Sequence, residues 1–128
     1  YPRGLGPTVS EIKEALRPYA PLEKISFDCC KGEAFPEKLA ATGRKKVILA
    51  GMETHVCVLQ TVIDLLMAGY RVVVGDDAVC SRRAHDRQSA LQEMARAGAQ
   101  VFSTEMIVFM LLEKAGTERF KRLSPLFK

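Results

Sequence analysis

The sequence contains no apolar run that reaches the roughly 20 residues a membrane-spanning helix requires. It does not open with the charged-then-apolar pattern of a signal segment, and it has neither a C-x-x-C pair nor a histidine cluster of the kind that binds zinc. We therefore expect no membrane partner, no metal and no cofactor. We interpret the four cysteines as reduced thiols of a cytoplasmic protein.

The excess of positive charge is also small. The chain has 19 lysines and arginines against 15 aspartates and glutamates, a formal net charge of +4, and the basic residues are dispersed among acidic ones. Because a nucleic-acid surface needs basic side chains clustered on one face, we expect no nucleic-acid partner. The sequence has no linker or repeat, and 128 residues suffice for one core, so we expect a single domain over residues 1–128.

Short apolar segments of strand type alternate with longer helical patterns. This alternation predicts an α/β fold with a doubly wound parallel sheet and helices on both faces, a three-layer Rossmann-like arrangement. Two of the helical patterns are so apolar that we also expect a homo-oligomer. The expected strands are 22–27, 46–51, 71–75 and 100–103, the expected helices are 56–69, 86–97 and 104–115, and a capping box from Thr8 to Glu11 predicts a further helix start.

Cys57 lies where a predicted strand gives way to a helix. The strand ends at Gly51, and the helical pattern begins near Thr54, a suitable N-cap residue. Ligands of open parallel sheets bind beyond the carboxyl ends of the strands, and the N–H groups at a helix N-terminus favour a thiolate or a developing oxyanion. Free cysteine is also often a small buried hydrophobe, so the pattern alone leaves a structural role for Cys57 open.

Three segments, "GMETHVCVLQT", "LLMAGYRVVVGDDAVCSR" and "HDRQSALQEMARAGAQVFSTE", resemble the isochorismatase-like cysteine hydrolases, a superfamily that includes nicotinamidases. The opening "YPRGLGPTV" is similar to the isochorismatase domain-containing proteins in particular. The resemblance runs from Tyr1 to Lys128, and its most specific motif is G-x-x-T-x-x-C-V-x-x-T at 51–61. It implies a hydrolase that cleaves an amide-type C–N bond of a small-molecule substrate through a cysteine nucleophile and a thioester intermediate.

The resemblance also implies roles for individual residues. Cys57 matches the nucleophile, and Lys24 matches a catalytic lysine that precedes an aromatic residue, here Phe27. A cis peptide bond is expected between Met52 and Glu53, with the backbone N–H groups of Glu53 and Cys57 forming the oxyanion hole. The expected pocket lining consists of Met52, Phe27 and His55; two positions before Cys57 on a helix, His55 would point away from the thiol.

One member of the family's triad has no match. The family places an aspartate in a first strand, ahead of the equivalent of "YPRGLG", and neither Asp28 nor Asp76 has that place. Asp77 matches an aspartate whose role is structural. We therefore expect that the sheet lacks its N-terminal strands in this chain and that a catalytic aspartate precedes Tyr1. The alternative is a non-catalytic interaction protein that keeps the fold without the triad aspartate.

Overall fold

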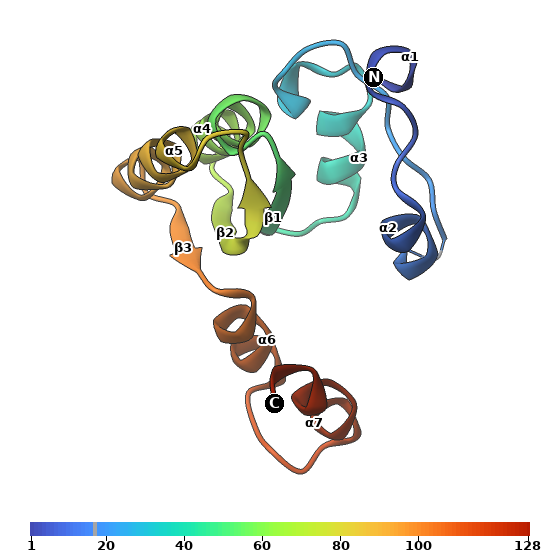
Figure 1. Ribbon diagram of the computed structural model, residues 1–128, viewed down its shortest axis with the longest axis vertical. Coiled ribbons are helices and arrows are strands. Elements are labelled where there is room, and N and C mark those ends of the chain that lie inside the picture. Colours follow the sequence, from blue (N-terminus) through green and yellow to red (C-terminus); the bar gives the residue numbers. More distant parts are fainter. Residues whose placement is uncertain (17) are drawn as a thin grey trace.

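The structure is a computed structural model that describes residues 1–16 and 18–128. Its centre is a parallel sheet in the order β1-β2-β3, with one helix after each strand (Figure 1). These elements are β1 (Lys46–Met52), α4 (Leu59–Met67), β2 (Arg71–Cys80), α5 (Ala84–Arg96), β3 (Gln100–Phe102) and α6 (Thr104–Leu112). Three of the four predicted strands and all three predicted long helices are thus confirmed, with changed boundaries.

Shorter elements flank this centre on both sides. Before β1 come α1 (Pro2–Leu5), α2 (Ser10–Ala15), the 3-10 turn η1 (Cys29–Lys31) and α3 (Phe35–Ala41). A π-helical turn, η2 (Thr54–Val58), joins β1 to α4, and the chain ends with α7 (Glu118–Leu123) and the 3-10 turn η3 (Ser124–Phe127). Figure 1 shows α3 beside β1, and α6 and α7 beyond β3.

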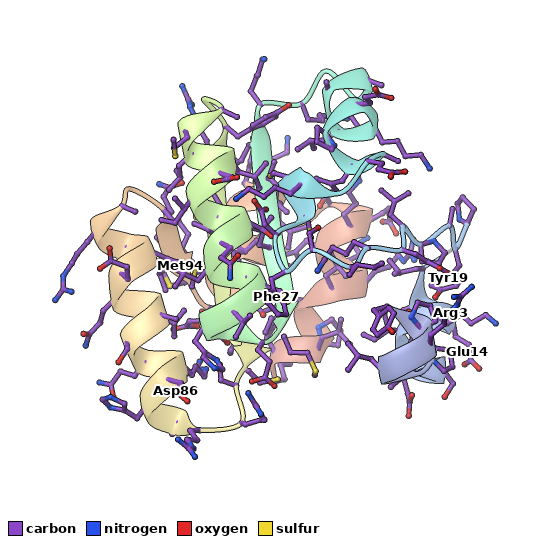
Figure 2. All side chains as sticks on the ribbon, turned by 90° about the horizontal axis from the view of Figure 1, so that it is seen from above. Arg3, Glu14, Tyr19, Phe27, Asp86 and Met94 are labelled. Atoms are coloured by element: carbon purple, nitrogen blue, oxygen red, sulfur yellow. The ribbon has the colours of Figure 1, made fainter. Side chains whose placement is uncertain are left out.

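One face of the sheet makes the main core. The register pairs Val47 with Val72 and Leu49 with Val74, so these side chains share a face. They pack against α4 and α5, where Met94 is fully buried; Figure 2 shows it between the two helices. Alternate residues of a strand point to opposite faces, which explains why continuous apolar runs form β1 and β2.

The other face of the sheet is covered over β2 and open over β1. Val73 is buried, and Ile107 of α6 lies against the same face, since its Cδ1 is 3.8 Å from the position a Cβ would take at Gly75. Ile48 pairs with Val73 but is 45 % exposed. Helices therefore lie on both faces, with α6 behind the strands in Figure 2, which confirms the layered arrangement where the sheet is covered.

The prediction of a strand at 22–27 is wrong. Lys24 Nζ donates to the carbonyl oxygens of Ser26 and Phe27, both at 2.8 Å, and Ser26 Oγ donates to the Asp28 carbonyl at 2.8 Å. Such local side-chain bonds hold the backbone in a loop in place of a ladder. Ile25 is largely exposed here, so the apolar residues that suggested a strand have no sheet to cover them.

The second strand continues five residues past its predicted end at Gly75, because it contains a bulge. Leu49 pairs with Val74, whereas Gly51 pairs with Val79, so the four residues Gly75–Ala78 of β2 stand opposite the single residue Ala50 of β1. Arg87 of α5 donates to the carbonyls of Asp76 and Val79 and spans the bulge. Asp77 Oδ1 accepts from the backbone N–H and the hydroxyl of Thr104, both at 2.7 Å, which confirms its expected structural role.

Two predicted helix boundaries also differ. The capping box at Thr8 is not formed: α2 begins at Ser10, and Thr8 Oγ1 instead accepts from the Tyr19 hydroxyl at 2.7 Å. Helix α6 ends at Leu112, three residues before its predicted end, and Glu113 takes a φ of 60°. Phe109 packs edge-on against Phe120 and Phe127, so the chain reverses to bring those rings back onto α6.

Candidate active site

Cys57 lies in η2, between the carboxyl end of β1 and the start of α4. Its side chain is partly buried and its thiol is free. A π turn widens the first turn of a helix, and such turns occur frequently at functional sites. The strand, the turn and the helix therefore place Cys57 at the edge of the sheet where parallel α/β folds bind ligands.

The hydrogen bonds of the turn centre on Glu53. Its carbonyl accepts from the N–H groups of Val56 and Val58, each at 3.2 Å, which lie on either side of Cys57. The Met52–Glu53 peptide bond is cis, as the resemblance implied. The prediction of Thr54 as N-cap is wrong, because the turn already includes Thr54 and Glu53 is the N-cap. Thr54 is fully buried, and its hydroxyl has no hydrogen-bond partner in the described part of the chain.

The side chain of Glu53 is held by the residues that follow β2. Its Oε2 accepts from the backbone N–H of Arg82 at 3.2 Å and lies 3.4 Å from Arg82 Nε. This contact exists because the bulge in β2 lets Met52 pair with Cys80, so the ends of β1 and β2 finish side by side. Arg82 is itself largely exposed, so the ion pair fixes the direction of the Glu53 side chain more than it adds stability.

His55 joins three elements. Its Nδ1 lies 2.9 Å from Ser81 Oγ and 3.7 Å from Glu53 Oε2, and its Nε2 lies 3.9 Å from Asp86 Oδ2 at the start of α5. Figure 2 shows Asp86 at the end of α5 that lies near the first turn of α4. His55 is thus a partly buried bridge between the Cys57 turn, the end of β2 and α5. Its expected role as pocket lining stays a prediction.

Lys24 and Phe27 lie in a loop ahead of η1. The hydrogen bonds of Lys24 Nζ described above use two of the three donors of its ammonium group. Lys24 lines two neighbouring hollows of about 280 and 640 Å³; the lining residues described for them do not include Cys57. Phe27 is 62 % exposed, and Met52 is also largely exposed, so both are surface residues in this structure.

Thr61 connects the Lys24 loop to the Cys57 turn. Its hydroxyl accepts from the backbone N–H of Cys29 at 3.0 Å and donates to the carbonyl of Cys57 at 2.7 Å. Thr61 is 1 % exposed, and its place in the motif at 51–61 is explained by these two bonds. Figure 2 shows Phe27 beside α4, in the loop that this contact fastens.

Sequence reasoning identified Met52, Glu53, His55 and Cys57, which are neighbours in the chain, and the structure keeps them together at the end of β1. It missed several residues that complete the surroundings. Because the strand was predicted to stop at Gly75, the residues after Cys80 were not expected near the site. A prediction that the strand continues through "VC" would have placed the following "SRR" beside the end of β1. The missed residues are Thr61, Ser81, Arg82 and Asp86.

Two features are absent from residues 1–16 and 18–128. No three His, Cys, Asp or Glu side chains gather in a group that could hold a metal ion. Among the same residues, no helix has the length and apolar composition required to cross a membrane.

Comparisons with known proteins place the chain in a family. The family model described as "Isochorismatase domain" matches residues 3–106. Among curated proteins, a secreted isochorismatase effector from Phytophthora sojae is 42 % identical over all of this chain and 63 % of its own length. The isochorismatase domain-containing protein 2 of Bos taurus is 38 % identical over all of this chain and 61 % of its own length. The chain thus spans about three fifths of these curated relatives.

Solved structures agree with the fold. A protein described as MAR1 ribonuclease from Caenorhabditis elegans is 38 % identical, with a TM-score of 0.86 over 98 % of this chain and 65 % of that one. The YcaC gene product of Escherichia coli, described as an octameric hydrolase of unknown specificity, is 32 % identical, with a TM-score of 0.79 over 85 % and 54 %. A nicotinamidase from Bacillus subtilis is 30 % identical, with a TM-score of 0.61 over 63 % and 45 %. With its parallel sheet, its helices on both faces and its motif at the end of β1, the chain belongs to the isochorismatase family.

Proposed function

We propose that this chain carries the nucleophile of a hydrolase that cleaves a small amide-type C–N bond, and that the nucleophile is Cys57. The observation that carries the proposal is the position of Cys57: a partly exposed free thiol in the first, π-helical turn after β1, at the carboxyl end of the sheet. The N–H groups of a helix start stabilise negative charge, so this place favours both the thiolate and an oxyanion.

In the proposed mechanism, Cys57 Sγ attacks the carbonyl carbon of the amide and forms a tetrahedral intermediate. The backbone N–H groups of Glu53 and Cys57 donate to the oxyanion. The C–N bond then breaks, the amine leaves with a proton, and a thioester remains on Cys57 until water hydrolyses it. The Glu53 side chain, held by Arg82 and His55, fixes the peptide that supplies the first donor.

Lys24 is proposed to hold negative charge near the thiolate. Two of its protons are used by the carbonyls of Ser26 and Phe27, which anchor the ammonium group, and the third is available to a partner. The base that removes the thiol proton is the aspartate implied by the family resemblance, and it is not among these 128 residues. The activity proposed here therefore requires such an aspartate in addition to the residues of this chain.

The relatives suggest two further features. The octameric relative supports a homo-oligomer, and the exposed side chains of Met106, Met110 and Leu111 on α6 give this chain an apolar surface suited to contact another copy. The relative described as a ribonuclease raises RNA as a substrate class. We favour a small amide, because the basic residues of this chain are dispersed and the candidate nucleophile is a thiol. Since one relative is described as secreted, the cytoplasmic location stays a prediction.

Alkylation kinetics test the proposal. The rates of iodoacetamide labelling at Cys57 and at the exposed Cys80 are measured by peptide mass spectrometry from pH 5 to pH 9, in parallel with hydrolysis of a panel of small amides and of a single-stranded RNA. In a protein that joins this chain to the aspartate implied by the family resemblance, we expect Cys57 to react fast below pH 7, Cys57→Ala to abolish amide hydrolysis, and the matched variant Cys80→Ala to keep it.

Three outcomes contradict the proposal. Labelling of Cys57 that rises only near the free-thiol pKa of about 8.5 indicates a passive thiol and supports the non-catalytic alternative. Amide turnover that persists in Cys57→Ala excludes this nucleophile. RNA cleavage that depends on Cys57, without amide hydrolysis, replaces the substrate class.

A further inference from the structure

Asp28 is a buried residue whose carboxyl group has a hydrogen-bond donor at only one of its two oxygens. It lies at the N-cap of η1 and is 1 % exposed, and its Oδ1 accepts from the backbone N–H of Cys30 at 2.8 Å. Its Oδ2 is buried and has no hydrogen-bond donor among the described residues. An ionised oxygen in this state is strongly unfavourable, so the carboxylate requires a proton or a cation nearby.

Two groups face this oxygen. Lys31 Nζ, at the end of η1, lies 3.9 Å from Asp28 Oδ2 and also 3.9 Å from Asp64 Oδ2, on α4. The ammonium of Lys31 is too far from either oxygen for a hydrogen bond. The neighbouring Asp28 carboxyl group, followed by burial, raises the pKa of Asp64, and the charge of Lys31 opposes this rise. Two carboxyl groups that face the same ammonium group are close enough for each to favour protonation of the other.

We propose that Asp28 and Asp64 share one proton, and that this carboxyl–carboxylate clasp holds Cys29–Lys31 against α4 and positions the Lys24 loop relative to Cys57. The proposal rests on the proposed function for its catalytic meaning. In the clasped state Asp64 donates its proton to Asp28 Oδ2, which satisfies the orphaned oxygen. Asp28 and Asp64 are positioning residues, since they act through the loop and the helix.

The surroundings of the pair favour a shared proton over a bound metal. Lys31 Nζ lies 3.9 Å from one oxygen of each carboxyl group, so a positive charge already faces both. The other titratable neighbours are the thiols of Cys29 and Cys30, and burial together with the two carboxylates raises the pKa of Cys30 to about 12, so it stays neutral. Helix α3, which packs on η1, contributes apolar side chains, Phe35 and Leu39, to the core.

The clasp and the Thr61 contact act on the same segment. Asp28 holds the N–H of Cys30, while Thr61 holds the N–H of the preceding residue, Cys29, and the carbonyl of Cys57. Loss of the shared proton places two like charges between η1 and α4. The Lys24 loop, which leads directly into Asp28, then loses its fastening to the helix that follows Cys57.

The direction of the pH effect follows from Asp64. Because its pKa is raised in the folded state, its contribution to stability is fully present below the ordinary aspartate pKa and is lost as the pH rises through the raised value. Asp64→Asn replaces the shared proton with an amide N–H that donates to Asp28 Oδ2 at every pH. Asp64→Ala removes both the charge and the donor.

The test is the melting temperature of the wild-type chain and of these variants between pH 4 and pH 8. We expect Asp64→Asn to melt above wild type at pH 7.5 and the two to converge toward pH 4, while Asp64→Ala lacks this gain. Glu93→Gln is the matched control, since it removes an exposed carboxylate paired with Arg96 on α5 and should not change the pH profile. The clasp is overturned if Asp64→Asn melts below wild type at pH 7.5, which is what loss of the attraction to Lys31 alone would cause. It is also overturned if the difference in melting temperature between Asp64→Asn and wild type is constant across pH.

A second readout reports on positioning. Alkylation of Cys29 in wild type at pH 8 should be faster than in Asp64→Asn, because the unclasped segment exposes this thiol; equal rates overturn the positioning role. The rate at Cys57 is measured in the same digest. A slow, passive Cys57 contradicts the proposed function alone, whereas the clasp is decided by the melting profiles and by Cys29.

Discussion

Replacing Thr61 with valine keeps the shape of the side chain and removes one hydroxyl group. Threonine and valine have similar helix propensities, so α4 itself should form equally well. The bond from Thr61 Oγ1 to the Cys57 carbonyl is an i to i−4 contact within the helix, a type that adds little stability. The bond from the Cys29 N–H, across 32 positions of sequence, is the one whose loss matters.

The magnitude follows from what happens to the Cys29 N–H. A buried donor left without an acceptor destabilises by about 1–3 kcal/mol, and this contact is only partly buried, so we expect Thr61→Val to lower the free energy of unfolding by about 1–2 kcal/mol. Urea unfolding followed by circular dichroism measures this change. Hydrogen exchange of the Cys29 amide, which should become faster in the variant, assigns it to the contact.

Thr61→Ser is the matched control, because it retains the hydroxyl and loses a methyl group. It should keep the protection of the Cys29 amide. The reasoning is refuted if Thr61→Val unfolds at the same urea concentration as wild type, or if Thr61→Ser loses amide protection to the same extent as Thr61→Val.

Three further predictions follow from single contacts. Asp77→Ala should lower the melting temperature at pH 7, because Thr104 at the start of α6 loses its hydrogen-bond acceptor. Since the hydrogen bonds from Thr104 lower the pKa of Asp77, the difference from wild type should shrink as the pH falls through that lowered value. Equal melting temperatures at pH 7 would contradict this prediction. Cys30, whose pKa burial raises to about 12, should resist iodoacetamide at pH 8 while exposed Cys80 is labelled; comparable rates would show that Cys30 is not held as described. Met94→Ala empties a fully buried position between α4 and α5 and should cost about 2–5 kcal/mol in urea unfolding, so a loss below 1 kcal/mol would mean that the core collapses around it.

The layered arrangement of strands and helices was predictable because it depends on periodic apolar patterns. "KVILA" and "RVVV" are apolar on both faces of a strand, and "LQTVIDLLM" places its apolar residues on most of a helix surface. Such patterns report burial directly, and burial decides which face meets the core. The position of Cys57 between a strand and a helix was predictable for the same reason, whereas its catalytic role comes from the resemblance and stays a prediction.

What failed was determined by side-chain hydrogen bonds and by contacts between elements, which apolar periodicity does not report. Residues 22–27 have the composition of a strand, but the bonds of Lys24 and Ser26 to nearby carbonyls hold a loop. The continuation of β2 depends on Arg87, which spans the bulge from another element. The pairing of Asp28 with Asp64 likewise joins residues 36 positions apart, and no local pattern indicates it.

The bulge in β2 makes chain length, more than residue identity, the critical property of Gly75–Ala78. These four residues separate the Leu49–Val74 pair from the Gly51–Val79 pair, so their number sets which residues of β2 stand beside Met52 and Glu53. Deleting one residue would shift Ser81 and Arg82 by one position and turn their side chains toward the opposite face of the sheet, away from His55. A one-residue deletion in this segment should therefore be far more damaging than substitution of Ala78, and in homologues that keep the Glu53 contact we expect this segment to vary in sequence while its length stays fixed.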